Sequence, residues 1–159
     1  MISKLNLSEF VNELEENTTK GNPSIKGTPL VILTIFEDTK KKFYGEFNKS
    51  SFRLTRNSVF YPIPYIFEGK INVKNDSSTN ISLKIKPIWF GYLWIRILPI
   101  FALILFNIGF ITQENIIATE IPIFRNILVI LMFAHIWYTI RKKKKLLKDF
   151  HEIFKISED

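Results

Sequence analysis

The chain has 159 residues, of which 47% are apolar, and it carries a net charge of +7 and no cysteine. Without cysteine it has no disulfide, no thiolate metal site and no cysteine nucleophile. The apolar residues gather in residues 88–140, where Arg96, Glu114, Glu120 and Arg125 are the only charged side chains, and this partition argues against a single soluble domain and against a large enzyme with several pockets.

The first predicted element is a short amphipathic helix at residues 7–17. Asn6 stands at the N-cap position and Glu9 follows three residues later, a pattern typical of a capping box. Leu7, Phe10 and Leu14 then repeat at helical spacing, which places them on one face. This apolar face needs a surface to cover it.

Residues 30–86 are typical of β-strands, because β-branched and aromatic residues alternate with polar ones between short runs of turn-forming residues. Pro62 and Pro64 cannot donate ladder hydrogen bonds, so they favour a bend in the chain or an edge strand of the sheet at these positions. We expect an antiparallel meander of about five strands at residues 30–36, 43–48, 52–56, 66–73 and 80–86. With the helix before it, the meander forms a β-rich module at residues 1–87 that we expect to be cytoplasmic.

Residues 88–140 predict a two-helix transmembrane hairpin, with spans at about residues 93–112 and 121–140. Each apolar run reaches the ~20 residues that a helix needs to cross a bilayer. The predicted fold class is therefore an α+β membrane protein, in which the short helix and the meander precede the hairpin and a C-terminal amphipathic helix follows it.

The flanks of the hairpin predict its orientation. Positive charge follows the second span, whereas the linker at residues 113–120 has two glutamates and no basic residue. Because basic flanks favour the cytoplasmic side, both termini are expected on the cytoplasmic side of a bacterial inner membrane and the linker on the outer side. The residues expected at lipid headgroups are Arg141, Lys142, Lys143, Lys144, Lys145 and Lys148. The expected interfacial aromatic belt consists of Trp89, Tyr92, Trp94, Trp137 and Tyr138.

Four polar residues fall inside the predicted spans: Arg96, Asn107, Arg125 and His135. The two arginines lie close enough to the membrane edges for their guanidinium groups to reach the headgroups. In an antiparallel hairpin, any polar contact would join Asn107 to Arg125 or His135 to Arg96.

Residues 141–159 predict a basic amphipathic tail whose apolar face includes Leu146, Phe150 and Phe154. This face is suited to an anionic lipid surface, and equally to docking on the strand module or on the helix at residues 7–17. The lipid bilayer is thus the expected partner, with a protein partner or self-association as further possibilities. Nucleic acid is not expected, because the densest basic run adjoins an apolar segment.

The segments FYGEF (43–47), FRLTRN (52–57), PIP (62–64), EGK (68–70) and ISLKIKP (81–87), in that order before two apolar runs, resemble a group of small uncharacterised bacterial two-pass membrane proteins with a cytoplasmic β-rich module. The resemblance covers about residues 40–140. It implies a shared fold and topology and carries no known activity, so it assigns no site residue.

No catalytic arrangement is recognised in the sequence. His135 and His151 have no metal-ligand spacing to other residues, and there is no glycine-rich phosphate loop or nucleophile elbow. We therefore expect no enzyme activity, no catalytic or metal site and no cofactor. Arg53 and Arg56 give a weak indication of an anion site.

The function predicted from these features is that of a non-enzymatic two-pass inner-membrane protein whose β-rich module senses a ligand or binds a partner. The alternative is an oligomeric pore-forming or membrane-disrupting effector that is triggered through the same module.

Overall fold

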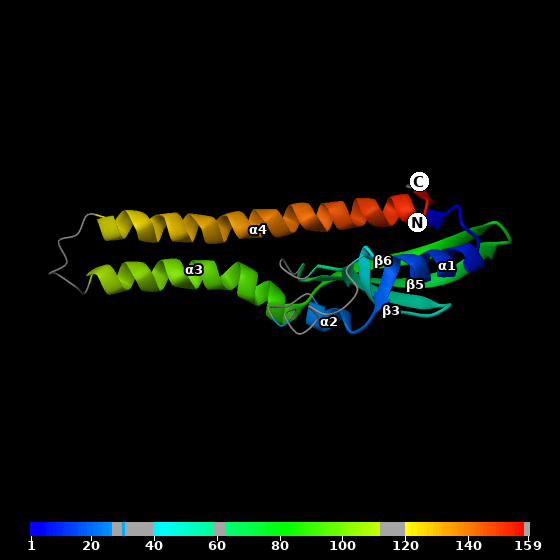
Figure 1. The fold of residues 1–159 in the computed structure, drawn as a ribbon, viewed down its shortest axis with the longest axis horizontal. Helices are drawn as coiled ribbons and strands as arrows, with labels where there is room; N and C mark the ends of the chain where they lie inside the picture. The colour runs from blue at the N-terminus through cyan, green and yellow to red at the C-terminus, as the bar shows by residue number, and fades with distance from the viewer. Residues whose placement is uncertain (27–29, 31–39, 59–62, 112–119, 158–159) are drawn as a thin grey trace.

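The computed structural model describes residues 1–26, 30, 40–58, 63–111 and 120–157. Its sheet, together with the N-terminal helix, forms one end of an elongated molecule, and two long helices lie side by side and extend away from that end (Figure 1). The N-terminus and residue 157 lie close together at the sheet end, where Ile2 pairs with Ser157.

In the described part of the chain, the sheet has seven strands in the order β2-β3-β4-β5-β6-β1-β7. All neighbouring strands are antiparallel except β2 and β3, which are parallel. The strands are β1 (Ile2–Ser3), β2 (Thr18–Lys20), β3 (Phe43–Phe47), β4 (Ser51–Arg56), β5 (Tyr65–Asn75), β6 (Ser78–Pro87) and β7 (Ile156–Ser157).

The predicted N-terminal helix is confirmed as α1 (Leu7–Asn17). Its capping box is complete: the Glu9 backbone N–H donates to Asn6 Oδ1 at 2.9 Å, and the Asn6 backbone N–H donates to Glu9 Oε2 at 3.0 Å. The two bonds satisfy backbone donors that a helix start otherwise leaves unpaired, so the helix begins where the sequence predicts.

Four of the five predicted strands are present as β3, β4, β5 and β6, and the fifth, at residues 30–36, lies almost wholly outside the described residues. A second helix, α2 (Pro23–Lys26), contacts β3 and β4. The strands β1, β2 and β7 were not predicted, because two or three residues are too few to show an alternating pattern.

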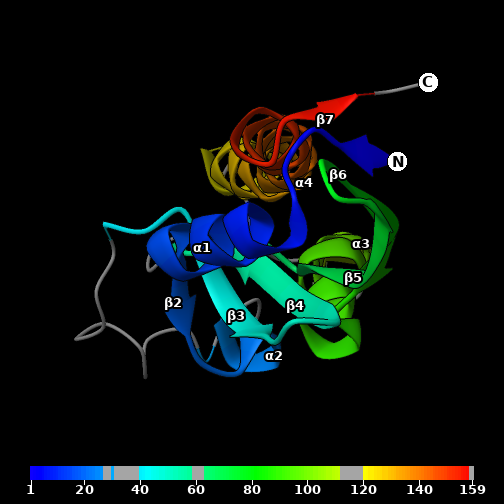
Figure 2. The same ribbon diagram turned by 90° about the vertical axis from the view of Figure 1, so that its right-hand side faces the viewer.

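The core lies between one face of the sheet and two helices, α1 and the C-terminal end of α4 (Glu120–Ile153). Figure 2 shows both helices on this face. Phe10 of α1 and Phe154 have ring centroids 4.5 Å apart, and Phe150 lies 5.4 Å from Phe52 of β4. The apolar face of the predicted tail is therefore docked on the strand module and on α1.

The predicted transmembrane hairpin is wrong. The two long helices are α3 (Trp89–Ile111) and α4, and within the residues that the structure describes neither is long and apolar enough to span a bilayer. This finding overturns the membrane fold class, the spans at 93–112 and 121–140 and the multi-pass inner-membrane location with cytoplasmic termini. It also overturns the two-pass function and its pore-forming alternative. The linker at residues 113–120 falls almost wholly outside the described residues.

The helices themselves explain the error. The predicted span at 93–112 accepted Arg96 within its length, and the helix α3 that contains it also includes Pro99. The second apolar run does not end as a separate element at Ile140, because α4 continues through the basic residues to Ile153. There its buried face belongs to the core of the sheet module. Counting residues along the sequence did not reveal that one helix, α4, carries exposed apolar side chains in its first half and contributes buried side chains to the sheet core at its C-terminal end.

Candidate functional site

Large apolar side chains are exposed along both long helices, and we call this set the apolar surface. Spacings of three or four residues place most of those on α3 along one helical face. Contiguous exposed apolar patches of this kind mark interaction sites. The apolar surface consists of Trp89, Phe90, Trp94, Ile97, Ile100, Phe101, Leu103, Ile104, Leu105 and Ile108 on α3, and Ile127, Ile130, Leu131, Phe133 and Trp137 on α4.

Part of the apolar surface is hollowed. A shallow groove of about 310 Å³ runs along the first turns of α3. Its lining is entirely apolar and includes two large aromatic side chains, Phe90 and Trp94, whose rings stack with centroids 6.3 Å apart. The full lining is Phe90, Leu93, Trp94, Ile97, Leu98 and Phe101.

At the end of the two long helices nearer the sheet, four basic side chains lie over aromatic rings. We call these eight residues the basic–aromatic belt, which overlaps the apolar surface at Trp137 and along α3. The distances from the cationic group to the ring centroid are 3.5 Å for Arg141 over Trp137, 4.9 Å for Lys142 over Tyr138, 5.5 Å for Arg96 over Tyr92 and 4.7 Å for Lys143 over Tyr65. Each such contact is worth ~0.5–1 kcal/mol at an exposed site.

Helix geometry produces three of these four contacts. Trp137 and Arg141 are four residues apart on α4, as are Tyr138 and Lys142, and so are Tyr92 and Arg96 on α3. The fourth contact joins α4 to β5, and sequence reasoning missed Tyr65 because its partner is distant in the chain. The Tyr65 ring also meets the Tyr92 ring edge to face at 6.3 Å, which links α3 to the same belt.

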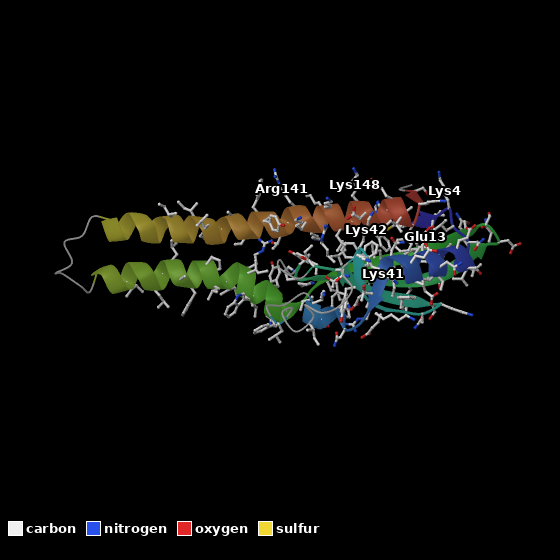
Figure 3. The ribbon with its side chains drawn as sticks, viewed as in Figure 1. Lys4, Glu13, Lys41, Lys42, Arg141 and Lys148 are labelled. Carbon is white, nitrogen blue, oxygen red and sulfur yellow. The ribbon has the colours of Figure 1, made fainter. Side chains whose placement is uncertain are left out.

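The basic run at residues 141–145, which includes three of the four cations of the belt, is not balanced by acidic side chains in the described part of the chain. Among the described residues, Arg141, Lys142, Lys143, Lys144 and Lys145 form no ion pair, and Lys148 is paired with Glu152 at 3.5 Å. Figure 3 shows Arg141 and Lys148 on the side of α4 that faces away from α3. The run thus keeps a strong local excess of positive charge.

The sheet module holds the belt in place. Leu146 and Phe150 of α4, and Phe154 just beyond its end, are fully buried in the core, directly after the basic run. On the same helix Asp149 pairs with Arg56 of β4 at 3.8 Å, and both side chains are largely buried. Because α4 is anchored there, the belt has a defined position relative to the sheet.

The structure brings together some of the predicted site residues and leaves others outside its description. Tyr92, Trp137 and Tyr138 lie in the belt with Arg96, Arg141 and Lys142, while Trp89 and Trp94 are exposed on α3. The side chains of Asn107, Arg125 and His135 are outside the described residues. Contacts between Asn107 and Arg125, or between His135 and Arg96, therefore stay predictions.

No group of three or more histidine, aspartate or glutamate residues suited to a metal ion occurs in the part of the chain that the structure describes. Comparison with known proteins gives no match to a protein-family model, to a curated protein or to a solved structure. The resemblance of residues 40–140 to small bacterial two-pass membrane proteins stays an expectation from sequence motifs, and the described helices contradict the two-pass topology that it implies.

Proposed function

We propose that the chain binds an anionic lipid surface, with the basic–aromatic belt against the headgroups and the adjoining apolar surface against the acyl region. Contact of this kind needs an apolar face and a basic run, and requires no helix that crosses the bilayer. The observation that carries the proposal is the position of the belt, because unbalanced cations and aromatic rings lie together where the apolar surface begins.

The residue types in the belt match the chemistry of a headgroup layer. Tryptophan and tyrosine favour the interface because each has an apolar ring and a polar atom. Each basic residue near an anionic surface is worth ~1 kcal/mol, so Lys142–Lys145 and Arg141 together supply substantial attraction. The exposed apolar side chains of α3 add the second component, since charge alone gives weak and salt-sensitive binding.

Charge also distinguishes a lipid surface from a second copy of the chain. A parallel copy packed against the apolar surface would bring its own basic run beside the first, and like charges at an interface oppose association. An anionic lipid surface has the opposite charge. We therefore assign the lipid surface as the occupant, and self-association becomes an outcome that the experiment must detect.

The test is sedimentation of the full-length chain with neutral vesicles of phosphatidylcholine and with vesicles that also contain phosphatidylglycerol. One variant replaces Lys142, Lys143, Lys144 and Lys145 with glutamine. At ~1 kcal/mol per residue, the four substitutions together should weaken binding to the anionic vesicles by nearly 1,000-fold, on the order of 4 kcal/mol. The matched control replaces Lys4, Lys49, Lys74 and Lys155, which are exposed elsewhere, and should bind like the original chain.

Three results would contradict the proposal. Equal losses in the two variants would mean that only net charge matters. Equal binding of the original chain to neutral and anionic vesicles would remove the role of the belt. Concentration-dependent dimers that form without lipid and bury the tryptophans would show that a second copy covers the apolar surface.

A further inference from the structure

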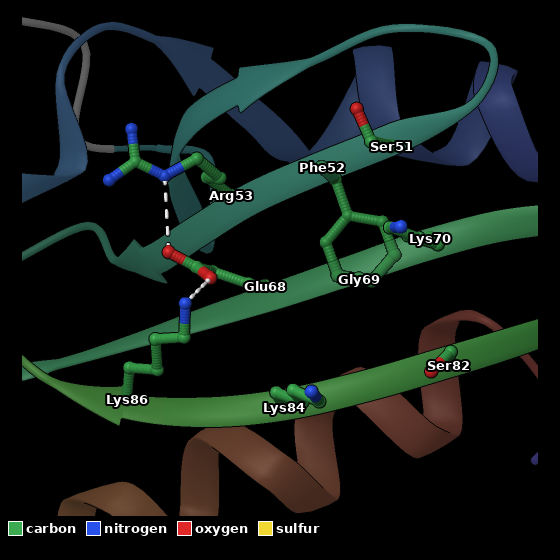
Figure 4. A pocket seen from close by; sticks show the side chains of 9 residues that line it. All are labelled: Ser51, Phe52, Arg53, Glu68, Gly69, Lys70, Ser82, Lys84 and Lys86. Carbon is green, nitrogen blue, oxygen red and sulfur yellow. Dashed lines mark ion pairs between the residues drawn. The ribbon is translucent and has the colours of Figure 1, made fainter.

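The second face of the sheet has an open, charged part that the belt does not use. Helices α1 and α4 cover the first face, and α2 covers part of the second beside β3 and β4. The second face also has a hollow of about 410 Å³ over β4, β5 and β6 (Figure 4). Its lining is Ser51, Phe52, Arg53, Glu68, Gly69, Lys70, Ser82, Lys84 and Lys86.

One side of the hollow is electrically balanced. Glu68 forms two ion pairs: Lys86 Nζ lies 2.6 Å from its Oε2, and Arg53 Nε lies 3.4 Å from its Oε1. Arg53 Nη1 also lies 3.7 Å from Glu46 Oε2. The hydrogen bond from Lys86, supported by the charges of Lys86 and Arg53, holds the pKa of Glu68 below its ordinary value. These two cations and two carboxylates therefore compensate each other.

The other side of the hollow is not balanced. The strand register places Lys70 directly opposite Ser82, and Lys84 lies two residues further along β6 on the same face. Neither Lys70 nor Lys84 has an acidic partner among the residues that the structure describes. In Figure 4 both lysine side chains are seen nearly end-on, so they project out of the sheet toward the viewer.

Hydroxyl groups complete this side. Ser51, which is paired with Lys70 from the other neighbouring strand, already donates to Asn48 Oδ1 at 3.2 Å. The Ser82 hydroxyl makes no hydrogen bond within the described part of the chain. Directly opposite residues have Cβ atoms about 4.5–5.5 Å apart, and residues i and i+2 of a strand are about 6.6 Å apart. The two ammonium groups and the Ser82 hydroxyl therefore come within reach of one tetrahedral anion.

We propose that Lys70, Lys84 and Ser82 bind a phosphate monoester in its dianionic form. Two uncompensated positive charges match the two negative charges of that group, and the Ser82 hydroxyl supplies a neutral donor between them. A monoanion of the same shape, such as a sulfate monoester, leaves one ammonium without a partner and binds more weakly. The site is separate from the belt, so it stands whether or not the belt binds lipid.

The experiment is an NMR titration of the full-length chain with methyl phosphate and, in parallel, with methyl sulfate at pH 7.5. Methyl phosphate should shift the amide signals around Lys70, Ser82 and Lys84, and methyl sulfate should bind up to about fivefold more weakly, since it forms one charged contact instead of two. Below the second pKa of the ester, which is about 6, the affinity for methyl phosphate should fall toward that for methyl sulfate.

Variants locate the binding. Lys70→Gln and Lys84→Gln should each weaken methyl phosphate binding by about fivefold, and together by more than about tenfold. Lys49→Gln combined with Lys74→Gln is the matched control, because both lysines are exposed and lie outside the hollow. Equal losses in both pairs, equal binding of the two esters, or signal shifts elsewhere on the surface would overturn the proposal.

The phosphate group has two possible sources, and a vesicle experiment separates them. Phosphatidic acid carries a phosphate monoester, whereas phosphatidylglycerol carries a diester with a single charge. In a background with Lys142–Lys145 replaced by glutamine, preference for phosphatidic acid that is lost in the Lys70→Gln, Lys84→Gln variant assigns the site to a lipid headgroup. Binding of methyl phosphate without that preference assigns it to a soluble phosphorylated molecule.

Discussion

The two ends of the molecule treat apolar side chains in opposite ways. At the sheet end Phe10, Phe150 and Phe154 are completely buried, whereas on α3 and α4 side chains of similar size, such as Phe101, are exposed. One helix, α4, contributes to both ends. The contrast teaches that the sheet module has a closed core of its own, and that the exposed apolar residues are available for binding.

The largest expected effect tests this contrast by shortening one aromatic side chain at each end. Phe150 lies within 6.1 Å, between ring centroids, of Phe43, Phe52, Phe67 and Phe154. Phe150→Ala should lower the free energy of unfolding by about 3–5 kcal/mol, because it leaves a cavity in a closed core. Phe101→Ala, at a position that is 55% exposed, should change it by less than about 0.5 kcal/mol. Urea denaturation measures both, and similar losses would erase the contrast.

The next effect concerns how tightly the sheet packs against its own core. A Cβ atom added at Gly69 would lie 2.1 Å from the Phe52 ring. Gly69→Ala should therefore cost about 1–3 kcal/mol through overpacking, measured by the same denaturation. Ser82→Ala, on the facing strand at an exposed position, serves as the control and should be nearly neutral. A neutral Gly69→Ala would mean that the ring moves freely.

A smaller effect is expected at the start of α1. Asn6→Ala removes the side-chain acceptor of the capping box and should cost about 1 kcal/mol of stability. The control is Asn72→Ala, which removes a side-chain amide at an exposed position of β5 and should leave the free energy of unfolding nearly unchanged. Stability equal in the two variants would show that the cap does not stabilise the fold.

The smallest effect is a pH dependence from Glu68. Its folded-state pKa lies below the ordinary value of 4.5, first because Lys86 donates a hydrogen bond to it. The ionised form therefore stabilises the fold above about pH 4.5, and this contribution is lost as the pH falls through the lowered pKa. The partners are partly exposed, so the loss should stay below about 1 kcal/mol. Denaturation curves of Glu68→Gln should lack this component of the acid dependence, and an unchanged acid profile would refute it.

Local patterns made several elements predictable. The capping box gives α1, and alternation between turn-forming runs gives β3 to β6, because neighbouring residues decide these structures. The strands β1 and β7 depend instead on pairing between the two ends of the chain, where Ser3 lies opposite Ile156. Two residues do not encode such a pairing in their own composition.

The candidate sites divide in the same way. Pairs four residues apart on a helix, such as Trp137 with Arg141, follow from helix geometry. The Lys143–Tyr65 contact requires the docking of α4 on the sheet. The Lys70–Ser82–Lys84 group requires the register of β5 and β6. The two arginines of β4 that suggested an anion site, Arg53 and Arg56, point to opposite faces of the sheet. Arg53 faces the hollow, whereas Arg56 faces α4.

The most direct test of lipid binding uses the tryptophans, since the chain has three and all lie at the belt or beside it. Trp89, Trp94 and Trp137 are 70%, 49% and 56% exposed. Adding vesicles that contain phosphatidylglycerol should shift their fluorescence to shorter wavelengths, and the Lys142–Lys145 glutamine variant should need far more lipid for the same shift. Emission that stays unchanged at saturating lipid would contradict the account.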